Sequence, residues 1–503
     1  MRPPARTLAW LVAVACAAPP ASRRFPDRPV AWDEHDDEDT PRPASSRPWE
    51  KGRVAHALRE HVVRRVDSAL AMTTRGPAAD VNALDEVPCS TWFCPKNHLD
   101  PVSLEALIAG PPGDRPKLPL RIERVKEAGV APGARVVDAR GHMYLLKIDP
   151  EPWFNMSVGA ELVGTRIFWA AGYNVAPAWA VDLTRADLAG DPAAIDRIFS
   201  AGAKTPDGKL RALAVAWIAG DILGGFDFKG RRAGDQNDRI PHQDRRSLRA
   251  TWVLFAWTNY SDPSSANTVD SWVSEGGRRF VRHYIVDFGS SLGSWTISPK
   301  PPHIGHRGMV VALAGKDPQK RWREALRRHP EVGYLKDIGW RPESYRSNLR
   351  NPAHQARVPA DEYWGAKVVT SFSDDQLYAI ASAAGYREEE ARQVARALAV
   401  RRDIIGRRFL ASATAIERPR RFGDLVCFED LALARGYRHH VLYRLRWLDA
   451  EGHTLARARA VTRRATNCLP IAGAGYRILE LQSGARPARI HLLDGKVVGL
   501  EHE

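Results

Sequence analysis

Hydrophobic and polar positions change their period several times along the chain, and each change predicts an element. Residues 135–149, RVVDARGHMYLLKID, have a strand-like apolar run on each side of an Arg-Gly turn, which predicts two β-strands. Residues 159–173 repeat apolar positions at helical spacing as far as Gly172. Residues 210–218 form an apolar run of strand length, and residues 245–260 predict a buried helix.

The second half of the chain is first helical and then rich in β-structure. A β-hairpin is expected over 267–289, where Glu-Gly-Gly separates two strand-like runs. Residues 360–415 contain several helical patterns, and from residue 422 short alternating runs around a Glu-Gly turn predict strands. We therefore expect an α+β protein that ends in a small all-β, sandwich-like domain over 422–503.

The first residues resemble an export signal. Arg2 and Arg6 precede an apolar run, residues 8–15, that is too short to span a bilayer as a helix. The sequence AVAC at 13–16 resembles a weak lipobox, in which Cys16 would carry a lipid and provide the only attachment to a membrane. An ordinary secretory signal and a start without export function are the alternatives. The sequence thus predicts an exported protein, either an envelope lipoprotein or periplasmic or extracellular.

A low-hydrophobicity segment follows this signal. Residues 17–50 are rich in Pro, Arg and acidic side chains, including DEHDDED at 33–39, and predict a disordered tether. A helical pattern follows at 54–71, and the role of residues 79–133 stays open.

The other cysteines suit an oxidising compartment. Cys89 and Cys94 lie five positions apart in PCSTWFCP, whereas Cys427 and Cys468 both fall in the C-terminal region. Two local disulfides are the preferred interpretation, but spacing alone does not establish the connectivity. Neither pair has the CxxC spacing of a zinc site.

Composition sets further bounds. A chain of 503 residues with 44% hydrophobic residues can form two or three domains. The formal net charge is +15, but the arginines are scattered, without a long basic block or interleaved aromatic residues. We interpret this charge as a solvated surface and expect no nucleic-acid binding.

Five residues follow the order of a phosphoryl-transfer site. Such a site needs a Lys on a strand, a Glu on the next helix, and oxygen ligands for a metal ion. Lys147 ends a strand, and Glu161 lies in the first turn of the predicted helix. Asp262 and Asn267 have the D-x4-N spacing of a kinase catalytic loop, and Asp287 follows a strand in Asp-Phe-Gly. Each residue also has a plain structural interpretation, such as a turn or a helix-terminal charge.

This order resembles the protein-kinase-like superfamily, on the atypical side represented by HipA-like and secreted Fam20-like kinases. The resemblance implies that Lys147 contacts nucleotide phosphates and pairs with Glu161. It also implies that Asp262 is the catalytic base and that Asn267 and Asp287 bind Mg²⁺ or Mn²⁺. The stretches GAELVGTRIFWAAGYNV, PHQDRRSLR and VRHYIVDFGSSLGS also resemble a group of exported bacterial proteins whose reaction is unknown.

The kinase resemblance implies a two-lobed core and divides the chain accordingly. The expected parts are a signal with a weak lipobox (1–16), a tether and leading helix (17–78), an N-terminal extension (79–133), an N-lobe (134–220), a helical C-lobe (221–420) and a β domain (422–503). Tyr260 and Ser261 depart from the pattern, because kinases have His and Arg there. No GxGxxG loop precedes Lys147, and the turn DARGHM has a single Gly.

Three functions fit these observations. The preferred one is an exported kinase-like phosphotransferase that uses ATP or another nucleotide with Mg²⁺ or Mn²⁺ and acts on a protein or envelope-glycan acceptor. The second is a non-catalytic envelope lipoprotein that uses the same fold for binding. A metal-dependent hydrolase is the third. The complete set of five residues favours the enzyme, whereas the scarcity of ATP outside the cytoplasm argues against it.

Overall fold

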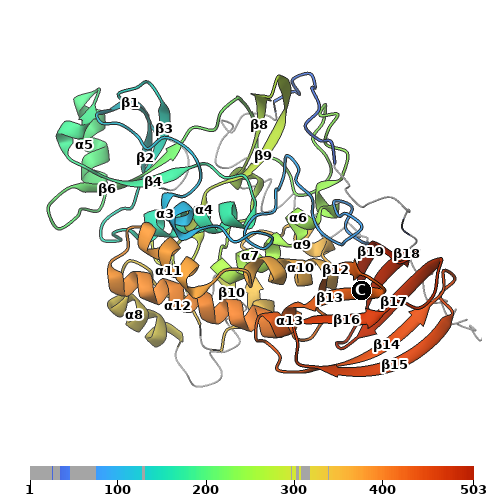
Figure 1. Ribbon diagram of the computed structural model, residues 1–503. Helices are drawn as coiled ribbons and strands as arrows, with labels where there is room; N and C mark the ends of the chain where they lie inside the picture. The colour runs from blue at the N-terminus through green and yellow to red at the C-terminus, as the bar shows by residue number, and fades with distance from the viewer. Residues whose placement is uncertain are drawn as a thin grey trace, which may run out of the picture.

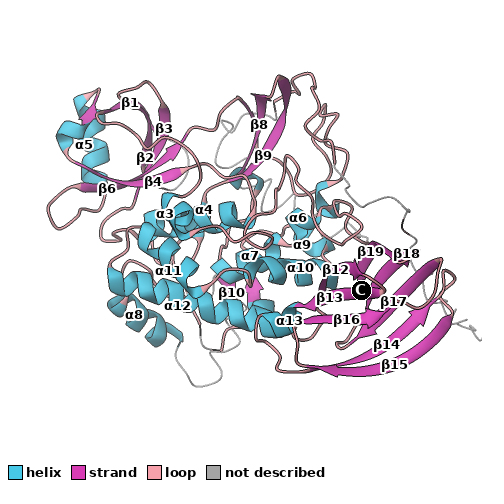
Figure 2. Ribbon diagram, viewed as in Figure 1, coloured by secondary structure: helices cyan, strands magenta, loops and turns pink. Residues whose placement is uncertain are grey.

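The computed structural model describes residues 25, 34–45, 75–126, 131–295, 297–301, 305–306, 318–337 and 339–503. It has a mixed α+β fold in which a sheet, a helical body and a β-rich region follow one another (Figure 1, Figure 2). The predicted signal with Cys16 and the helix expected at 54–71 lie outside the described residues. No described helix combines the length and the apolar composition needed to cross a membrane.

The first sheet is curled and has the strand order β4-β6-β3-β2-β1-β5. Its strands are β1 (Leu120–Val125), β2 (Gly133–Val137), β3 (Met143–Ile148), β4 (Ala178–Leu183), β5 (Leu188–Ala189) and β6 (Leu210–Ala216). Only the β1–β5 pairing is parallel among these neighbours. Because β1 belongs to this sheet, the sheet begins inside the segment that we expected to be a separate extension.

Burial alternates along β3 and so orients Lys147. Tyr144, Leu146 and Ile148 enter a core shared with α5 (Pro192–Ala201), which places Lys147 on the opposite face. Helix α4 (Met156–Ala171) contacts β3 and β4 and is buried along nearly its whole length. It begins before the expected residue 159, so Glu161 lies in its second turn rather than its first.

The predicted hairpin is present and belongs to a three-stranded sheet. Its strands are β7 (Asp221–Gly224), β8 (Thr268–Glu275) and β9 (Arg278–Ile285). Gly276 and Gly277 have φ of 57° and 79°, the left-handed values that a tight two-residue hairpin turn requires.

The helical body has its own extensive core. The helix expected over 245–260 consists of two helices that meet at Ala250, α6 (Arg246–Arg249) and α7 (Thr251–Thr258). The other helices are α3 (Leu104–Ala109), α8 (Pro318–Arg328), α9 (Pro352–Ala356), α10 (Pro359–Val369), α11 (Asp374–Ala383) and α12 (Glu388–Ile405). A π-helical turn, Gly406–Leu410, follows α12, and the two-residue strands β10 (Gly305–His306) and β11 (Tyr345–Arg346) pair with each other. Single 3₁₀ turns are η2 (Arg185–Asp187), η3 (His242–Asp244), η4 (Ser265–Asn267), η5 (Phe288–Ser290) and η7 (Pro342–Ser344).

Two sheets that share one core form the C-terminal region. The smaller sheet has β12 (Ile416–Phe422), β13 (Leu425–Asp430) and β16 (Thr466–Pro470), and α13 (Leu431–Ala434) follows β13. The larger has the order β15 (Thr454–Thr462), β14 (Val441–Leu448), β17 (Tyr476–Gln482), β18 (Ala488–Leu493) and β19 (Lys496–His502). The β-structure starts at Ile416, six positions before the expected boundary. Both cysteine pairs form disulfides, Cys89–Cys94 and Cys427–Cys468.

The acidic stretch is not a free tether where the structure describes it, at residues 34–45. Glu34 pairs with the buried Arg245 at 2.6 Å, and Asp36 accepts hydrogen bonds from the backbone and hydroxyl of Thr91. Asp39 accepts a hydrogen bond from the backbone of Arg279 on β9. The expectation of disorder was wrong here because these carboxylates find partners that lie far away in the sequence.

Candidate active site

Lys147 lies between two carboxylates. Its Nζ is 3.2 Å from Glu161 Oε2 and 3.1 Å from Asp287 Oδ1. The side chain of Glu161 is buried, whereas that of Asp287 is 39% exposed. The structure thus joins β3, α4 and the end of β9 at one point, where one carboxylate is accessible to solvent.

The close packing of α4 brings Asp287 to this point. Asp287 has a left-handed backbone, with φ of 63°, and the next side chain, Phe288, packs on Phe168 of α4 at 4.7 Å between ring centroids. A Cβ at Gly164 would lie 2.4 Å from the Cβ of Phe288, so a larger residue would push α4 away. Gly164 therefore keeps Glu161, one turn earlier on the same helix, within reach of Lys147.

The loop between α7 and β8 brings Asp262 and Asn267 together. Asn267 Nδ2 donates hydrogen bonds to Asp262 Oδ2 at 3.0 Å and to the hydroxyl of Tyr260 at 3.0 Å. The backbone N–H of Val286 donates to the carbonyl of Asn267 at 3.0 Å, which places this loop beside Asp287. The ring of Tyr260 also packs on that of Phe288. All five residues predicted from the sequence therefore lie in one region of the fold.

Burial and neighbouring charges set the pKa values of Lys147, Glu161 and Asp287. Burial opposes the charge of Lys147, but Asp287 and Glu161 outweigh it and raise the pKa of Lys147. Burial raises the pKa of Glu161. Burial would also raise the pKa of Asp287, but the neighbouring Lys147 lowers it below its ordinary value. The arrangement favours a charged Lys147 and an ionised Asp287.

Two further lysines surround the site. Burial lowers the pKa of Lys126, which follows β1, and the charges of Lys147, Asp287 and Glu161 act on it. Lys300 is 2% exposed and donates hydrogen bonds to the backbone carbonyls of Asn259 and Ser290. In the sequence, Asn259 lies three positions before Asp262, and Ser290 lies three positions after Asp287. The hydrophobic pattern did not indicate β1, and Lys300 stands alone between prolines, so neither lysine had a usable sequence signal.

Residues 126–132 connect β1 to β2. Strand β2 pairs with β3, which carries Lys147. In the β2–β3 pairing Gly133 lies directly opposite Lys147. Residues 127–130, in the middle of this segment, lie outside the described residues. The turn DARGHM joins β2 to β3, as the sequence predicted.

The donor atoms suit a hard cation shared with a ligand better than a metal site made by protein alone. No group of three or more His, Cys, Asp or Glu side chains that could hold a metal occurs among the described residues. Asp287 and Asn267 offer one carboxylate and one amide. Mg²⁺ with a phosphate ligand usually takes only one or two protein carboxylates and completes its shell with phosphate oxygens and water. The two residues fit that kind of binding.

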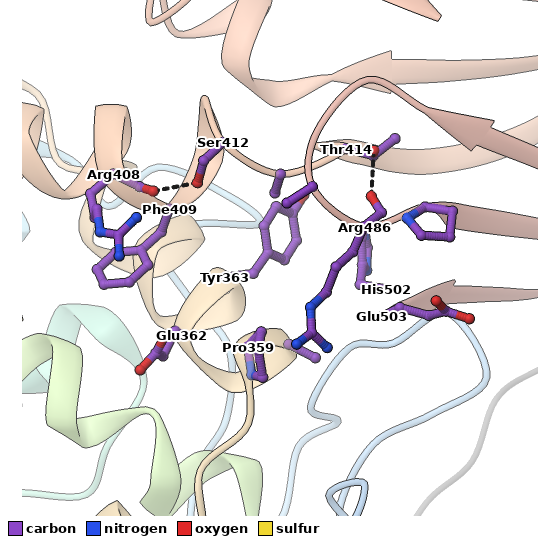
Figure 3. A pocket seen from close by; sticks show the side chains of 14 residues that line it. Pro359, Glu362, Tyr363, Arg408, Phe409, Ser412, Thr414, Arg486, His502 and Glu503 are labelled. Carbon is purple, nitrogen blue, oxygen red and sulfur yellow. Dashed lines mark hydrogen bonds between the residues drawn. The ribbon is translucent and has the colours of Figure 1, made fainter. Parts of the chain in front are cut away.

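Two cavities lie elsewhere, and none of the five predicted residues lines either of them. One, of about 170 Å³, is lined by Tyr363 of α10, by Arg408, and by Arg486 and His502 of the β-rich region (Figure 3). The other, of about 600 Å³, lies between the loop at 97–101, the α10–α11 turn and the end of α12.

Comparisons with known proteins add little. No protein-family model matches the chain, and no curated protein matches it. A solved structure of a Helicobacter pylori proinflammatory kinase, CtkA, is similar with a TM-score of 0.24 and 12% identity, over 57% of this chain and 97% of that chain. A likeness of this degree carries no argument about the reaction of this chain.

Proposed function

We propose that the protein is an exported, atypical kinase-like phosphotransferase that uses a nucleotide with Mg²⁺ or Mn²⁺. The observation that carries the proposal is the contact of Lys147 with both Glu161 and Asp287. A lysine anchored by a helix carboxylate beside a second, partly exposed carboxylate is the arrangement that protein kinases use for phosphoryl transfer. In this proposal the six-stranded sheet is one lobe, the helical body is the other, and the site lies between them.

Each residue then has a defined task. Glu161 holds the ammonium of Lys147, so that its remaining N–H donors can bind nucleotide phosphates. Asp287 and Asn267 would hold the metal ion, which neutralises charge on the transferred phosphoryl group. Asp262 would orient the acceptor hydroxyl and accept its proton. Asn267 contacts Asp262 through its amide nitrogen and thereby fixes the distance between base and metal ligand.

Binding would change the partners of Lys147. Without a ligand, Lys147 neutralises both Asp287 and Glu161. A bound metal ion would take over the charge of Asp287, and Lys147 would be free to face the phosphates. Nucleotide binding should therefore depend on the metal and on Asp287 together.

Thermal unfolding of the full chain with nucleotides and either metal ion tests the proposal. A ligand that binds the folded state raises the midpoint in proportion to ln(1 + [L]/Kd). We expect a metal-dependent rise that Asp287→Asn abolishes and that Asp375→Asn, an exposed exchange on α11, leaves unchanged. No rise with any nucleotide, in a folded protein, would instead favour the non-catalytic binding protein.

A second variant separates binding from chemistry. Asp262→Asn should keep the metal-dependent rise but lose phosphoryl transfer to the protein itself or to an acceptor. Transfer that persists in Asp262→Asn at the rate of the unchanged protein would remove Asp262 from the proposed role of base. Release of free phosphate without any transfer would favour the hydrolase.

A further inference from the structure

The outer face of β14 and β15 places arginine opposite arginine. In the antiparallel pairing of these strands, Arg444 lies across from Arg459, and Arg446 lies across from Arg457. All four residues are exposed. Like charges directly opposite each other on a sheet are destabilising, so this arrangement does not serve the fold of the sheet itself.

Among the described residues, an acidic partner offsets this charge only at Arg446. Arg446 donates to Glu480 on β17, but Arg444, Arg457 and Arg459 have no ion pair among the described residues. The acidic residues between the two strands, Asp449 and Glu451, lie in the turn, where Asp449 accepts hydrogen bonds from turn backbone. Arg463 and Arg464 follow β15 directly and lie at the opposite end of the ribbon from this turn, next to Val441 and Leu442.

Apolar side chains border the arginines. Leu442 and Val461 lie across from each other beside the Arg444–Arg459 pair and are 49% and 69% exposed. Leu455, near the other end of β15, is 51% exposed. Strand β15 is the edge of its sheet, and the ribbon lies far from the six-stranded sheet, at the lower right of Figure 1. The face is therefore basic in its centre and apolar at its ends.

We propose that this face, Arg444, Arg446, Arg457 and Arg459 with Leu442 and Val461, docks the protein on an anionic lipid bilayer. Guanidinium groups bind phosphate and carboxylate head groups with two hydrogen bonds each. Apolar side chains beside them enter the head-group region, and binding grows with both contributions. None of the six positions holds an aromatic side chain on which a single-stranded base could stack, which favours lipid over nucleic acid.

This inference is independent of the proposed reaction and of lipidation. It departs from our interpretation of the charge as a scattered, solvated surface, because the register of two strands brings together arginines that are up to 15 positions apart. It also gives the β-rich region a task, since it would hold the exported protein at a charged membrane surface even without a lipid on Cys16.

Vesicle sedimentation tests it, with the full chain carrying Cys16→Ser so that no lipid can be attached. The vesicles are phosphatidylcholine alone or with phosphatidylglycerol, at low and high salt. We expect binding only to the anionic vesicles, weakened by salt. Arg444→Glu with Arg457→Glu leaves an arginine opposite each new acid and should lower the affinity by about tenfold or more.

Two matched variants make the result specific. Arg197→Glu with Arg327→Glu reverses the same charge at exposed arginines on α5 and α8 and should leave binding unchanged. Arg444→Gln with Arg457→Gln replaces the first pair if circular dichroism shows that it does not fold. Equal losses in the control, no binding of the folded chain to anionic vesicles, or arginine-dependent binding to a DNA oligonucleotide but not to vesicles would each overturn the proposal.

Discussion

The predicted active site and the β14–β15 face treat charge in opposite ways. At the site Lys147 contacts two carboxylates, and the side chains of Lys147 and Glu161 are nearly buried. On the β14–β15 face arginines oppose arginines, and three of the four lack an ion pair within the described parts of the chain. Both regions are functional candidates, but only the first is neutralised by the fold itself.

Because of this difference, the two regions need different kinds of evidence for a function. A buried charge must be paired to be tolerated, so pairing alone at Lys147 does not distinguish a structural ion pair from a catalytic one. Water solvates an unpaired charge on a surface, so such a charge needs no partner. Two like charges directly opposite each other on neighbouring strands nevertheless destabilise the sheet, and an opposite charge at either position would remove this cost. The variants below change the pairing in each region, from the largest expected effect to the smallest.

Lys147→Met should cause the largest loss. Removing one partner of a buried ion pair leaves the others uncompensated and costs about 3–5 kcal/mol in the free energy of unfolding. Glu161 can take up a proton when Lys147 is absent, because its pKa is already raised by burial. A raised pKa stabilises the folded state at low pH, so the loss should be smaller at pH 5 than at pH 8. Urea unfolding at the two pH values measures this difference.

The control for this variant is Lys209→Met, which removes a solvent-exposed lysine side chain paired with Asp207 and should change stability little. Adding Glu161→Gln to Lys147→Met should restore part of the loss, since it removes the unpaired carboxylate. A loss from Lys147→Met that is no larger than that of the control would show that the pairing is not stabilising.

The site was more accessible to sequence reasoning than its surroundings. Strand and helix patterns and the D-x4-N spacing are local, and the order of a phosphoryl-transfer site joined them into the set Lys147, Glu161, Asp262, Asn267 and Asp287. Lys126 and Lys300 reach the site only through strand pairing and loop packing, which leave no local pattern. Gly164 is visible as a glycine in a helix, but its reason, the contact with Phe288, exists only in three dimensions.

Asp149 should give the protein a pH-dependent stability. It follows β3, is buried, and accepts hydrogen bonds from the first backbone N–H groups of α4 at 3.0 and 3.1 Å. Burial raises the pKa of Asp149 to about 7. The folded state therefore holds this proton more tightly than the unfolded state, and its contribution is lost as the pH rises through 7. We expect about 2–3 kcal/mol between pH 5 and 8, absent in Asp149→Asn, by denaturant unfolding at each pH. Identical pH profiles for the two proteins would contradict this.

Asp36→Ala tests whether the acidic segment is part of the fold. Asp36 is 3% exposed and accepts two kinds of hydrogen bond from Thr91, so its loss leaves buried donors without a partner. We expect a loss of about 1–2 kcal/mol and easier proteolysis between residues 34 and 45. Asp37→Ala, which removes an exposed pair with Arg278, should have little effect. If both variants behave alike, the segment does not stabilise the protein.

The fold was predicted where patterns are local and missed where partners are distant. The hairpin β8–β9 was confirmed because its two strands and Gly-Gly turn are contiguous in the sequence. We predicted disorder for residues 34–45 because their hydrophobicity is low. The sequence did not show that Glu34 and Asp39 contact Arg245 and Arg279, which lie more than 200 positions away. Strand β1 was missed because its alternation of apolar and polar residues is short, covering only Leu120 to Glu123.

Arg444→Glu alone should produce the smallest change, and the only one that stabilises. The substitution turns the repulsion with Arg459 into an opposite-charge pair across the strands, worth about 0.2–1 kcal/mol. The same exchange at Arg197, which opposes no arginine, should leave the unfolding midpoint unchanged. A stabilised protein that binds anionic vesicles less well would show that the sheet carries this repulsion for a partner outside the chain. An unchanged or lowered midpoint would mean that solvent already removes the repulsion, and the contrast between the two regions would lose its energetic basis.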